Sequence, residues 1–203
     1  FVILDEKFRV VRMFDSLVHP QRSIPSQVTQ IHGISNHAVR SAPTFADLLP
    51  DLMNCLSGTT HLVAHNISFD VGFLRAELSQ CAAEMPESFG RLCTMQIARR
   101  KRVAHNAKLS SVASALRIPT IAEAHRAIVD AAITARVLSL IHEEDATVTD
   151  SPICWPGYQP SNGCHRQFPR GNPVISMQSL AHFGLTIAAN SKMLRVSTAE
   201  STV

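Results

Sequence analysis

The sequence predicts an α/β domain in which a mixed sheet is flanked by helices. Short stretches rich in β-branched and aromatic residues alternate with longer segments of helical periodicity, and this alternation ends near residue 142. The length of 203 residues suits one ordinary domain with a tail or two small domains, and 45% hydrophobic with 17% charged residues is a globular balance. We therefore assign residues 1–142 to a folded domain and residues 143–203 to an acidic linker and a proline-containing tail.

The first half of the chain carries two strand signals and two helix signals. FVIL and FRVVRMFDSLV flank Asp5–Lys7 and predict a hairpin, whereas HPQRSIPSQ with its two prolines predicts a loop. Apolar residues recur at helical spacing from Phe45 to Leu56, which predicts an amphipathic helix. HLVAHN predicts a short buried strand. We expect a helix to follow, with Ser68 as its cap and an apolar side made of Phe69, Phe73, Leu74 and Leu78.

The second half repeats this alternation. RLC predicts another short strand, with Thr94 as the cap of a helix that runs into ARRKR. Residues 109–116 have a helical apolar stripe, and the last helix follows His125 and continues through Ile141. A hairpin followed by two short strands makes a thin sheet, so the prediction lacks an obvious central strand.

Hydropathy and cysteine usage exclude several classes of protein. No apolar run approaches the roughly 20 residues of a membrane span, and the sequence begins with no secretory signal pattern, so we expect no membrane partner. The five cysteines form neither a CxxC pair nor an even framework. Free thiols in a reducing, cytoplasmic compartment are the simplest interpretation.

Basic residues are concentrated between Arg91 and Ala122. This stretch holds seven lysines and arginines and no acidic residue, although the net charge of the chain is only +3. Such a stretch suggests an anionic partner, for which a phosphate backbone is a natural candidate. The alternative is a solvated, arginine-rich helix end, because cations are favourable at a helix C-terminus.

Two short motifs place polar side chains where a ligand could bind. AHNISFD (64–70) follows a strand, at the carboxyl end where α/β proteins form their ligand crevice; the alternative is a simple turn with an aspartate near a helix N-terminus. In QIHGIS (30–35) a glycine lets the backbone approach a ligand closely, and the alternative is a plain loop. The candidate residues are His65, Asn66, Phe69 and Asp70 in the first motif and His32, Gly33 and Ile34 in the second.

The stretch EAHRAIVDAA (123–132) carries an imidazole and a carboxylate five residues apart. On a regular helix this spacing is about 140° of rotation, so His125 and Asp130 cannot share one face, and they do not match the histidine spacing of a zinc helix. They fit better if His125 lies in the approach loop and Asp130 in the first inward-facing turn. An aspartate there can ligate a hard cation and a histidine can take a proton from water. The alternative is a solvated helix start with a charged first turn.

Taken in order, these motifs resemble those of a known family. LVHP, IP, IHGI and AP.F, then LVAHNISFD, then AHRAIVDA resemble the DEDDh 3′–5′ exonucleases, among them the proofreading epsilon subunit of bacterial DNA polymerase III and its stand-alone relatives. The resemblance covers residues 1 to about 141. It implies a ribonuclease-H-like fold, 3′ ends of single-stranded DNA as substrate, and two Mg²⁺ or Mn²⁺ ions that assist phosphodiester hydrolysis in proofreading or repair.

The resemblance also implies roles for individual residues. Asp70 and Asp130 would be metal ligands and His125 the general base. The pocket near the scissile nucleotide would be shaped by His65, Asn66 and Phe69, and the terminal base or sugar would contact His32, Gly33 and Ile34. Two alternatives stay open: a catalytically inactive subunit that binds nucleic acid or a polymerase, and an RNA-trimming exonuclease of the same family.

The first motif of that family, Asp-x-Glu on the central strand, is absent from this chain. Asp5 and Glu6 do not replace it, because adjacent side chains on a strand point to opposite faces and this pair falls in the predicted hairpin turn. Since Phe1 is not an initiator methionine, we expect the first strand to be encoded upstream. The chain as given would then lack much of its metal site. The alternative is a protein that evolved without the motif.

The tail carries one weaker partner hypothesis. QSLAHF (178–183) loosely resembles the glutamine-containing peptides that dock on a sliding clamp, although Ala181 stands where a larger aliphatic residue is usual. DNA polymerase or the sliding clamp is thus a candidate partner of the tail, and a marginal amphipathic helix is the alternative. The cysteines and histidines of the tail have no recognisable zinc spacing.

Overall fold

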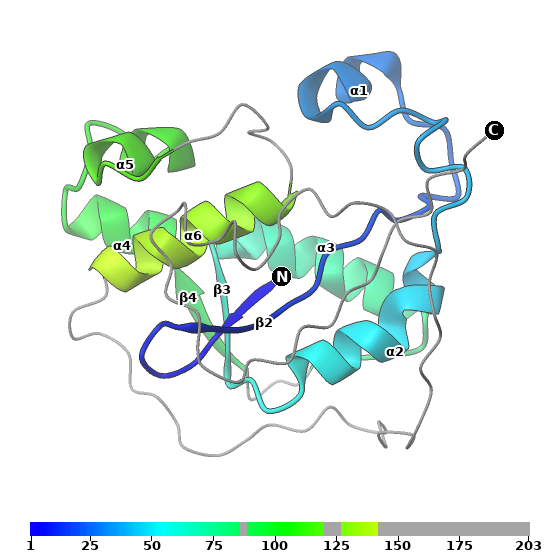
Figure 1. Cartoon of the computed structure of the whole chain (residues 1–203), viewed down its shortest axis with the longest axis horizontal. Helices are drawn as coiled ribbons and strands as arrows, with labels where there is room; N and C mark the ends of the chain where they lie inside the picture. The colour runs from blue at the N-terminus through cyan, green and yellow to red at the C-terminus, as the bar shows by residue number, and fades with distance from the viewer. Residues whose placement is uncertain (86–88, 120–126, 142–203) are drawn as a thin grey trace.

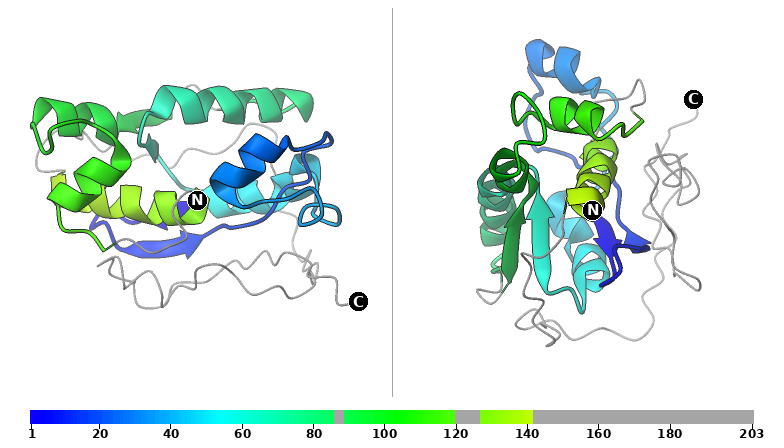
Figure 2. Two further views of the ribbon diagram at one scale, coloured as in Figure 1. Left: turned by 90° about the horizontal axis from the view of Figure 1, so that it is seen from above. Right: turned by 90° about the vertical axis from the view of Figure 1, so that its left-hand side faces the viewer.

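The fold is an α/β arrangement in which helices surround two small sheets (Figures 1 and 2). The computed structural model describes residues 1–85, 89–119 and 127–141. In these ranges the chain forms β1 (Val2–Leu4), β2 (Val10–Met13), α1 (Ser26–His32), α2 (Phe45–Leu56), β3 (His61–Ala64), α3 (Ile67–Gln80), β4 (Gly90–Cys93), α4 (Thr94–Arg100), α5 (Leu109–Ala115) and α6 (Ala127–Ile141). The predicted α/β class is therefore confirmed.

The strands of the described residues form two separate pairs. β1 pairs with β2 in antiparallel fashion and β3 pairs with β4 in parallel, so both strand directions occur, each in its own sheet and not in one mixed sheet. In the right-hand view of Figure 2, β1 stands apart from the β3–β4 pair. Helix α6 contacts both β1 and β3 and thereby connects the two sheets. The predicted thin sheet without a central strand agrees with this arrangement.

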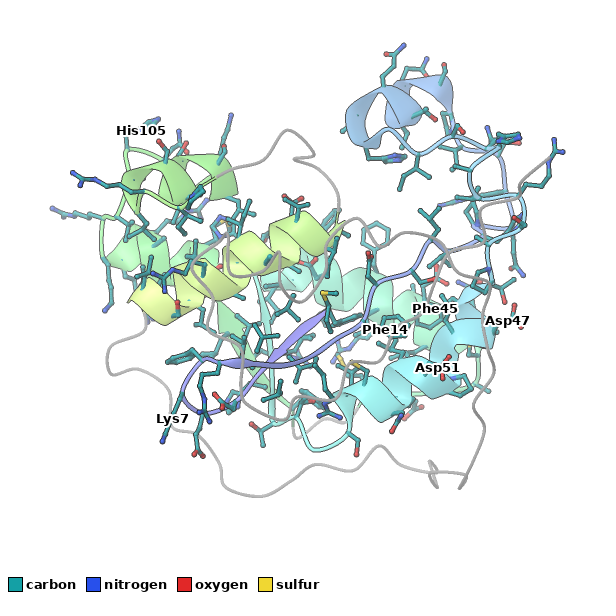
Figure 3. All side chains as sticks on the ribbon, in the orientation of Figure 1. Lys7, Phe14, Phe45, Asp47, Asp51 and His105 are labelled. Carbon is teal, nitrogen blue, oxygen red and sulfur yellow. The ribbon has the colours of Figure 1, made fainter. Side chains whose placement is uncertain are left out.

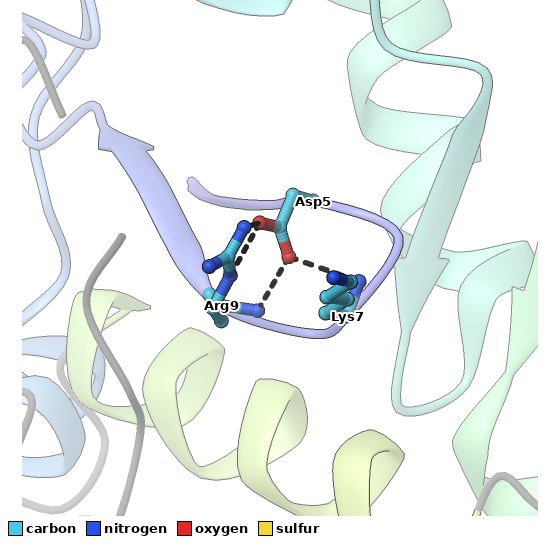
Figure 4. A network of polar contacts seen from close by, with 3 residues as sticks. All are labelled: Asp5, Lys7 and Arg9. Atoms are coloured by element: carbon cyan, nitrogen blue, oxygen red, sulfur yellow. Dashed lines mark hydrogen bonds and ion pairs between the residues drawn. The ribbon is translucent and has the colours of Figure 1, made fainter. Parts of the chain in front are cut away.

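The opening hairpin is closed by a network around Asp5 (Figure 4). The Asp5 carboxylate accepts hydrogen bonds from the backbone N–H groups of Lys7 and Arg9 at 3.0 and 2.9 Å, and its Oδ2 lies 2.6 Å from Nη2 of Arg9. Burial opposes ionisation, but these bonds outweigh it and hold the pKa of the Asp5 carboxyl below its usual range. Asp5 thus has a structural role in the predicted hairpin turn.

Helix α2 is the predicted amphipathic helix, with the predicted bounds. It begins with a capping box, in which the Thr44 side chain accepts from the backbone N–H of Asp47 and the Asp47 carboxylate accepts from the backbone N–H of Thr44. At its other end the Arg12 guanidinium donates to the carbonyls of Asn54 and Ser57 at 3.0 and 2.6 Å. A cation at the helix C-terminus is favourable, so Arg12 fastens β2 to α2.

The predicted loop at HPQRSIPSQ is wrong in its last residues, because α1 begins at Ser26. Pro25 occupies the N-cap position and Gly33 ends the helix in the left-handed conformation, with φ of 74°. None of the residues of α1 is buried, and Val28 and Ile31 are exposed. A helix that buries nothing has no apolar stripe facing a core, so periodicity gave no sign of it.

Two predicted helix caps are also wrong. Helix α3 begins at Ile67, after Asn66 in the left-handed conformation with φ of 87°, so Ser68 lies inside the helix. Helix α4 begins at Thr94 itself and its N-cap is Cys93. Thr94 is fully buried. Its hydroxyl is therefore directed at the interior, with consequences for the site.

The main core lies around α6. This helix packs against α4 and α5 and buries nine residues of the fifteen described in it. The predicted final helix is confirmed through Ile141, and the predicted helix at residues 109–116 is confirmed as α5, which ends at Ala115. The core cluster also includes Val10 and Met13 of β2.

Three of the cysteines lie in the part of the chain that the structure describes. Cys55, Cys81 and Cys93 are free thiols, as predicted. None of the helices in the described ranges is long and apolar enough to cross a membrane. The predictions for His125 and for residues 142–203 concern residues outside these ranges.

Candidate functional site

His65 is the residue that ties the candidate site together. It follows the last residue of β3 and is half-buried. Its Nε2 lies 2.7 Å from the carbonyl oxygen of Ala107, and its Nδ1 lies 2.9 Å from Oγ1 of Thr94. A carbonyl only accepts, so Nε2 carries the proton and donates to Ala107. His65 thus joins the end of β3 to the start of α4 and to the loop between α4 and α5.

Asp70 lies in the first turn of α3, which begins two residues after this histidine. The residue is exposed, yet desolvation at the site raises the pKa of its carboxyl above the usual range. The backbone hydrogen bond and the nearby His65 act in the opposite direction and only partly offset this rise. A carboxylate in a partly desolvated position is suited to bind a cation, which favours its ionised form.

Phe69 and Phe73 do not face the core, contrary to the prediction. They are 62% and 58% exposed, whereas α3 buries Ile67, Val71 and Leu78. The two rings lie 4.8 Å apart between centroids, at an interplanar angle of 57°. Helical spacing correctly placed the two phenylalanines next to each other on one side of α3, but both rings face away from the core. An exposed aromatic pair therefore flanks Asp70.

Asp130 lies in the first turn of α6 and is half-buried. Helices α3 and α6 both contact β3, so the two aspartates stand on helices that share one strand. His125 lies outside the described residues, and the convergence of Asp70, His125 and Asp130 on one site stays a prediction. The predicted placement of Asp130 in the first turn of the last helix agrees with the structure.

The donor set for metal ions is incomplete in the described residues. Their histidines, cysteines and acidic residues form no group of three or more that could hold an ion. One Mg²⁺ ion is commonly held by one or two carboxylates together with water and phosphate oxygens, but a pair of ions needs more carboxylates than Asp70 and Asp130 provide. The described residues therefore do not by themselves fit a complete two-ion site.

The second candidate motif lies at the end of α1. Gly33 donates its backbone N–H to the carbonyl of Thr29 at 2.7 Å, and the backbone N–H of Ile34 donates to Nδ1 of His32 at 3.0 Å. These bonds close a tight turn, for which the left-handed Gly33 is required. In Figure 1, α1 stands apart from β3 and the start of α3. A contact of these residues with a base or sugar stays a prediction.

Sequence reasoning missed the partners of His65. The sequence predicts Thr94 as a helix cap and gives no sign of a role for Ala107. A signal was available, because parallel pairing places Ala64 opposite Cys93, which makes the following residues, His65 and Thr94, neighbours. The contact with Ala107 has no such signal, since it joins residues 42 apart through the tertiary fold.

The fold is that of an exonuclease domain of the ribonuclease-H type. The chain belongs to the RNase_T family, described as exonuclease, because the family model matches residues 1–138. In the solved structure of exonuclease X in complex with 5′ overhanging duplex DNA, the similar part covers 69% of this chain and 78% of that chain, with a TM-score of 0.52 and 29% sequence identity.

Curated relatives match over parts of their length. The chain is 39% identical over 136 residues to a Mycobacterium tuberculosis protein named "Putative bifunctional exonuclease/endonuclease protein". The aligned region covers 66% of this chain and 21% of that relative. It is 41% identical over 80 residues to DNA polymerase III subunit epsilon of Treponema pallidum, covering 39% of this chain and 36% of the relative. For the 3′-5′ exonuclease DinG of Bacillus subtilis the identity is 32% over 85 residues, covering 42% of this chain and 9% of the relative. The chain thus spans between about a tenth and a third of these relatives.

Proposed function

We propose that the protein is a metal-dependent 3′–5′ exonuclease that releases nucleotides from DNA ends in proofreading or repair. The observation that carries this proposal is the family match over residues 1–138, which includes both Asp70 and Asp130 at the starts of their helices. Relatives named as an epsilon subunit and as a 3′-5′ exonuclease, and a similar structure bound to DNA, support the direction and the substrate.

The proposal gives the acidic and basic groups distinct tasks. Exonucleases of this family generally depend on divalent ions, which supply charge stabilisation for phosphodiester cleavage. Asp70 and Asp130 would be two of the ligands of Mg²⁺ or Mn²⁺, and His125 would accept the proton of the attacking water. The raised pKa of Asp70 supports its part, because a bound cation favours the ionised carboxylate that the free site disfavours.

The exposed aromatic pair on α3 supports a substrate with unstacked bases. Phe69 and Phe73 offer a surface on which a base of a single-stranded 3′ end can stack, an interaction worth about 1–3 kcal/mol per base. His65 and Asn66 lie within one turn of Phe69 and would shape the same pocket. Replacing Phe73 with alanine should then weaken binding of single strands more than binding of blunt duplexes.

A second function has one observation in its favour. Because the described residues hold no group of three metal-binding side chains, a catalytically inactive subunit that binds nucleic acid or a polymerase is the competing assignment. The relatives include a polymerase III subunit, so DNA polymerase is the partner to be considered in that case. An exonuclease that trims RNA is a third assignment, within the same family.

The experiment is release of a labelled nucleotide from the 3′ end of single-stranded DNA and of RNA by the full-length protein. Mg²⁺-dependent release from DNA that falls at least about 100-fold in Asp130→Asn is the expected result, since carboxylates of a catalytic unit are not interchangeable with amides. Equal release by both proteins would point to a contaminant. Binding of the strand without release would favour the inactive subunit, and faster release from RNA would favour the trimming enzyme.

A further inference from the structure

A cluster of cations occupies the end of the molecule formed by α4 and the loop that follows it. We call the basic segment the set Arg99, Arg100, Lys101, Arg102 and Lys108; all five are exposed. Figure 3 shows side chains with nitrogen ends projecting outward from this end of the fold, around the labelled His105. The site described above uses none of these side chains.

Positive charge is concentrated in the basic segment and is not spread over the whole chain. Residues 91–119 contain no aspartate or glutamate, whereas the whole chain has a net charge of only +3. The ion pair between Arg9 and Asp5 lies in the β1–β2 turn, in another part of the molecule. A patch of one sign on a nearly neutral protein creates a positive field at this end of the surface.

Helix stability accounts for only part of the segment. Arg99 and Arg100 lie in the last turn of α4 and Lys101 is its C-cap, where cations are favourable. Lys108, in contrast, is the N-cap of α5, has no side-chain capping bond, and faces the positive end of the helix dipole. Arg102 adopts a left-handed conformation with φ of 51°, which costs a non-glycine residue stability. These two residues are unexplained by the fold.

The basic segment is fastened to the candidate site by a named contact. His65 Nε2 donates to the carbonyl of Ala107, the residue that precedes Lys108. The backbone N–H of Lys108 in turn donates to Oδ1 of Asn106 at 3.0 Å, which fixes the loop as a turn. The Lys108 end of the segment therefore lies beside His65, the residue that precedes the N-cap of α3.

We infer that the basic segment binds the phosphate backbone of the nucleic-acid strand whose 3′ end occupies the site, on the nucleotides that precede that end. Guanidinium and ammonium groups neutralise phosphates without reading the base sequence, so this contact sets affinity and register. The inference takes its ligand class from the proposed function. It adds that strand length, beyond the terminal nucleotides, contributes to binding.

The test is the salt dependence of binding, measured in EDTA so that cleavage is not required. Fluorescence anisotropy of a labelled single-stranded oligonucleotide is followed between about 50 and about 200 mM salt. The segment variant is Arg99→Gln with Lys101→Gln and Lys108→Gln. The matched control is Lys7→Gln with Arg22→Gln and Arg40→Gln, which removes the same charge from exposed positions outside the segment. Equal thermal unfolding midpoints verify that all three proteins are folded.

The expected result is a change in slope in the segment variant alone. Each lost phosphate contact lowers the slope of log K against log salt by about 0.7 for a single strand, so three contacts lower it by about 2. The affinity lost across this salt range then becomes about 20-fold smaller than in the wild type. Lys101→Arg with Lys108→Arg should keep the wild-type slope. If the triple variant fails to fold, Lys108→Gln alone should still lower the slope by about 0.7.

Three results would overturn the inference. Equal slopes in wild type and segment variant mean that the segment does not contact phosphates. An equal fall in segment variant and control means that net charge matters and position does not. Binding to phosphatidylserine vesicles, but not to the oligonucleotide, assigns the segment to a membrane surface. If the segment variant alone has the lower slope but the wild-type protein releases no nucleotide, the proposed function is contradicted and this inference stands.

Discussion

The side chains of His65 and Thr94 are hydrogen-bonded to each other at the carboxyl ends of two parallel strands, with 2.9 Å between Nδ1 and Oγ1. Thr94 is fully buried and its Oγ1 also lies 3.4 Å from the carbonyl oxygen of Ala64. Nε2 of His65 donates to the carbonyl of Ala107, so the ring is held by hydrogen bonds at both of its nitrogens. One buried hydroxyl thus fixes the ring that connects the start of α3 to the basic segment.

Thr94→Val should remove this connection with little change in side-chain volume. It leaves Nδ1 of His65 without its hydrogen-bond partner, which costs about 1–3 kcal/mol in the free energy of unfolding, and the basic segment loses its fixed position. Thr94→Ser keeps the hydroxyl and should cost less than Thr94→Val. Urea unfolding and oligonucleotide affinity measure the two effects. A serine variant that is as unstable as the valine variant would mean that the methyl group, and not the hydroxyl, supplies the stability.

Asp70 should make the protein less stable as its carboxyl ionises. Its pKa is raised in the folded state by desolvation, so the folded protein binds this proton more tightly than the unfolded chain. The stability from this group is fully present below the ordinary aspartate pKa and is lost as the pH rises through the raised value. Asp70→Asn should therefore remove this loss of stability with rising pH in mildly acidic solution.

Urea unfolding of wild type and Asp70→Asn from about pH 4 to about pH 8 measures this difference. Because Asp70 is exposed, the effect should be modest. If the asparagine variant is destabilised most at neutral pH, the fold stabilises the ionised carboxylate. That result would contradict the claim that desolvation raises the pKa of Asp70.

The pKa of the Cys93 thiol should lie below that of an ordinary cysteine, and the pKa of the Cys55 thiol should lie above it. Burial raises the pKa of the Cys55 thiol. Burial acts in the same direction on Cys93, but the backbone N–H groups of Ile67 and Gln96, at the starts of α3 and α4, outweigh it and lower the pKa of that thiol. Mass-spectrometric alkylation profiles should give a lower midpoint pH for Cys93 than for Cys55. Equal midpoints would show that the two helix starts do not act on the sulfur.

The same lowered pKa has a consequence for stability. A depressed pKa in the folded state favours folding above the ordinary cysteine pKa, and this contribution is lost as the pH falls through the lowered value. Cys93→Ala should abolish the gain in stability across that alkaline interval, whereas Cys81→Ala, at a half-buried position of another segment, should preserve it.

Gly90→Ala should destabilise the parallel pair through a single clash. Gly90 is the partner of His61 in the β3–β4 register, and a Cβ at position 90 would overlap the His61 ring. Overpacking of this kind typically costs about 1–3 kcal/mol. Removing the ring in the double variant His61→Ala, Gly90→Ala should restore most of the loss. Additive losses in this double-mutant cycle would place the strain elsewhere.

The elements that the sequence predicted well are those with an apolar stripe facing a core. The hairpin, α2, α5 and α6 were predicted because their buried residues recur with the period of the element. Helix α1 buries nothing and was missed. Residue type alone predicts Ser68 and Thr94 as caps, but the cap position is decided by where the preceding strand ends, and here Asn66 and Cys93 hold those positions.

The sequence predicted the position of each candidate site residue within its helix, but not the contacts between segments that are distant in the sequence. The motif order placed Asp70 and Asp130 in the first turns of their helices, which the structure bears out. The outward turn of Phe69 and Phe73 depends on which stripe of α3 meets the sheet, and spacing cannot decide this. The bond from His65 to Ala107 joins segments separated by a whole βα unit, so only the folded chain reveals it.

The most direct test of the central claim is Mn²⁺ binding by the full-length protein in a double-mutant cycle of Asp70→Asn and Asp130→Asn. If both carboxylates belong to one metal site, each single variant should lose nearly as much affinity as the double variant, measured by electron paramagnetic resonance or calorimetry. Wild-type affinity in both single variants, or losses that simply add, would show that the two aspartates serve separate places and would contradict the nuclease site.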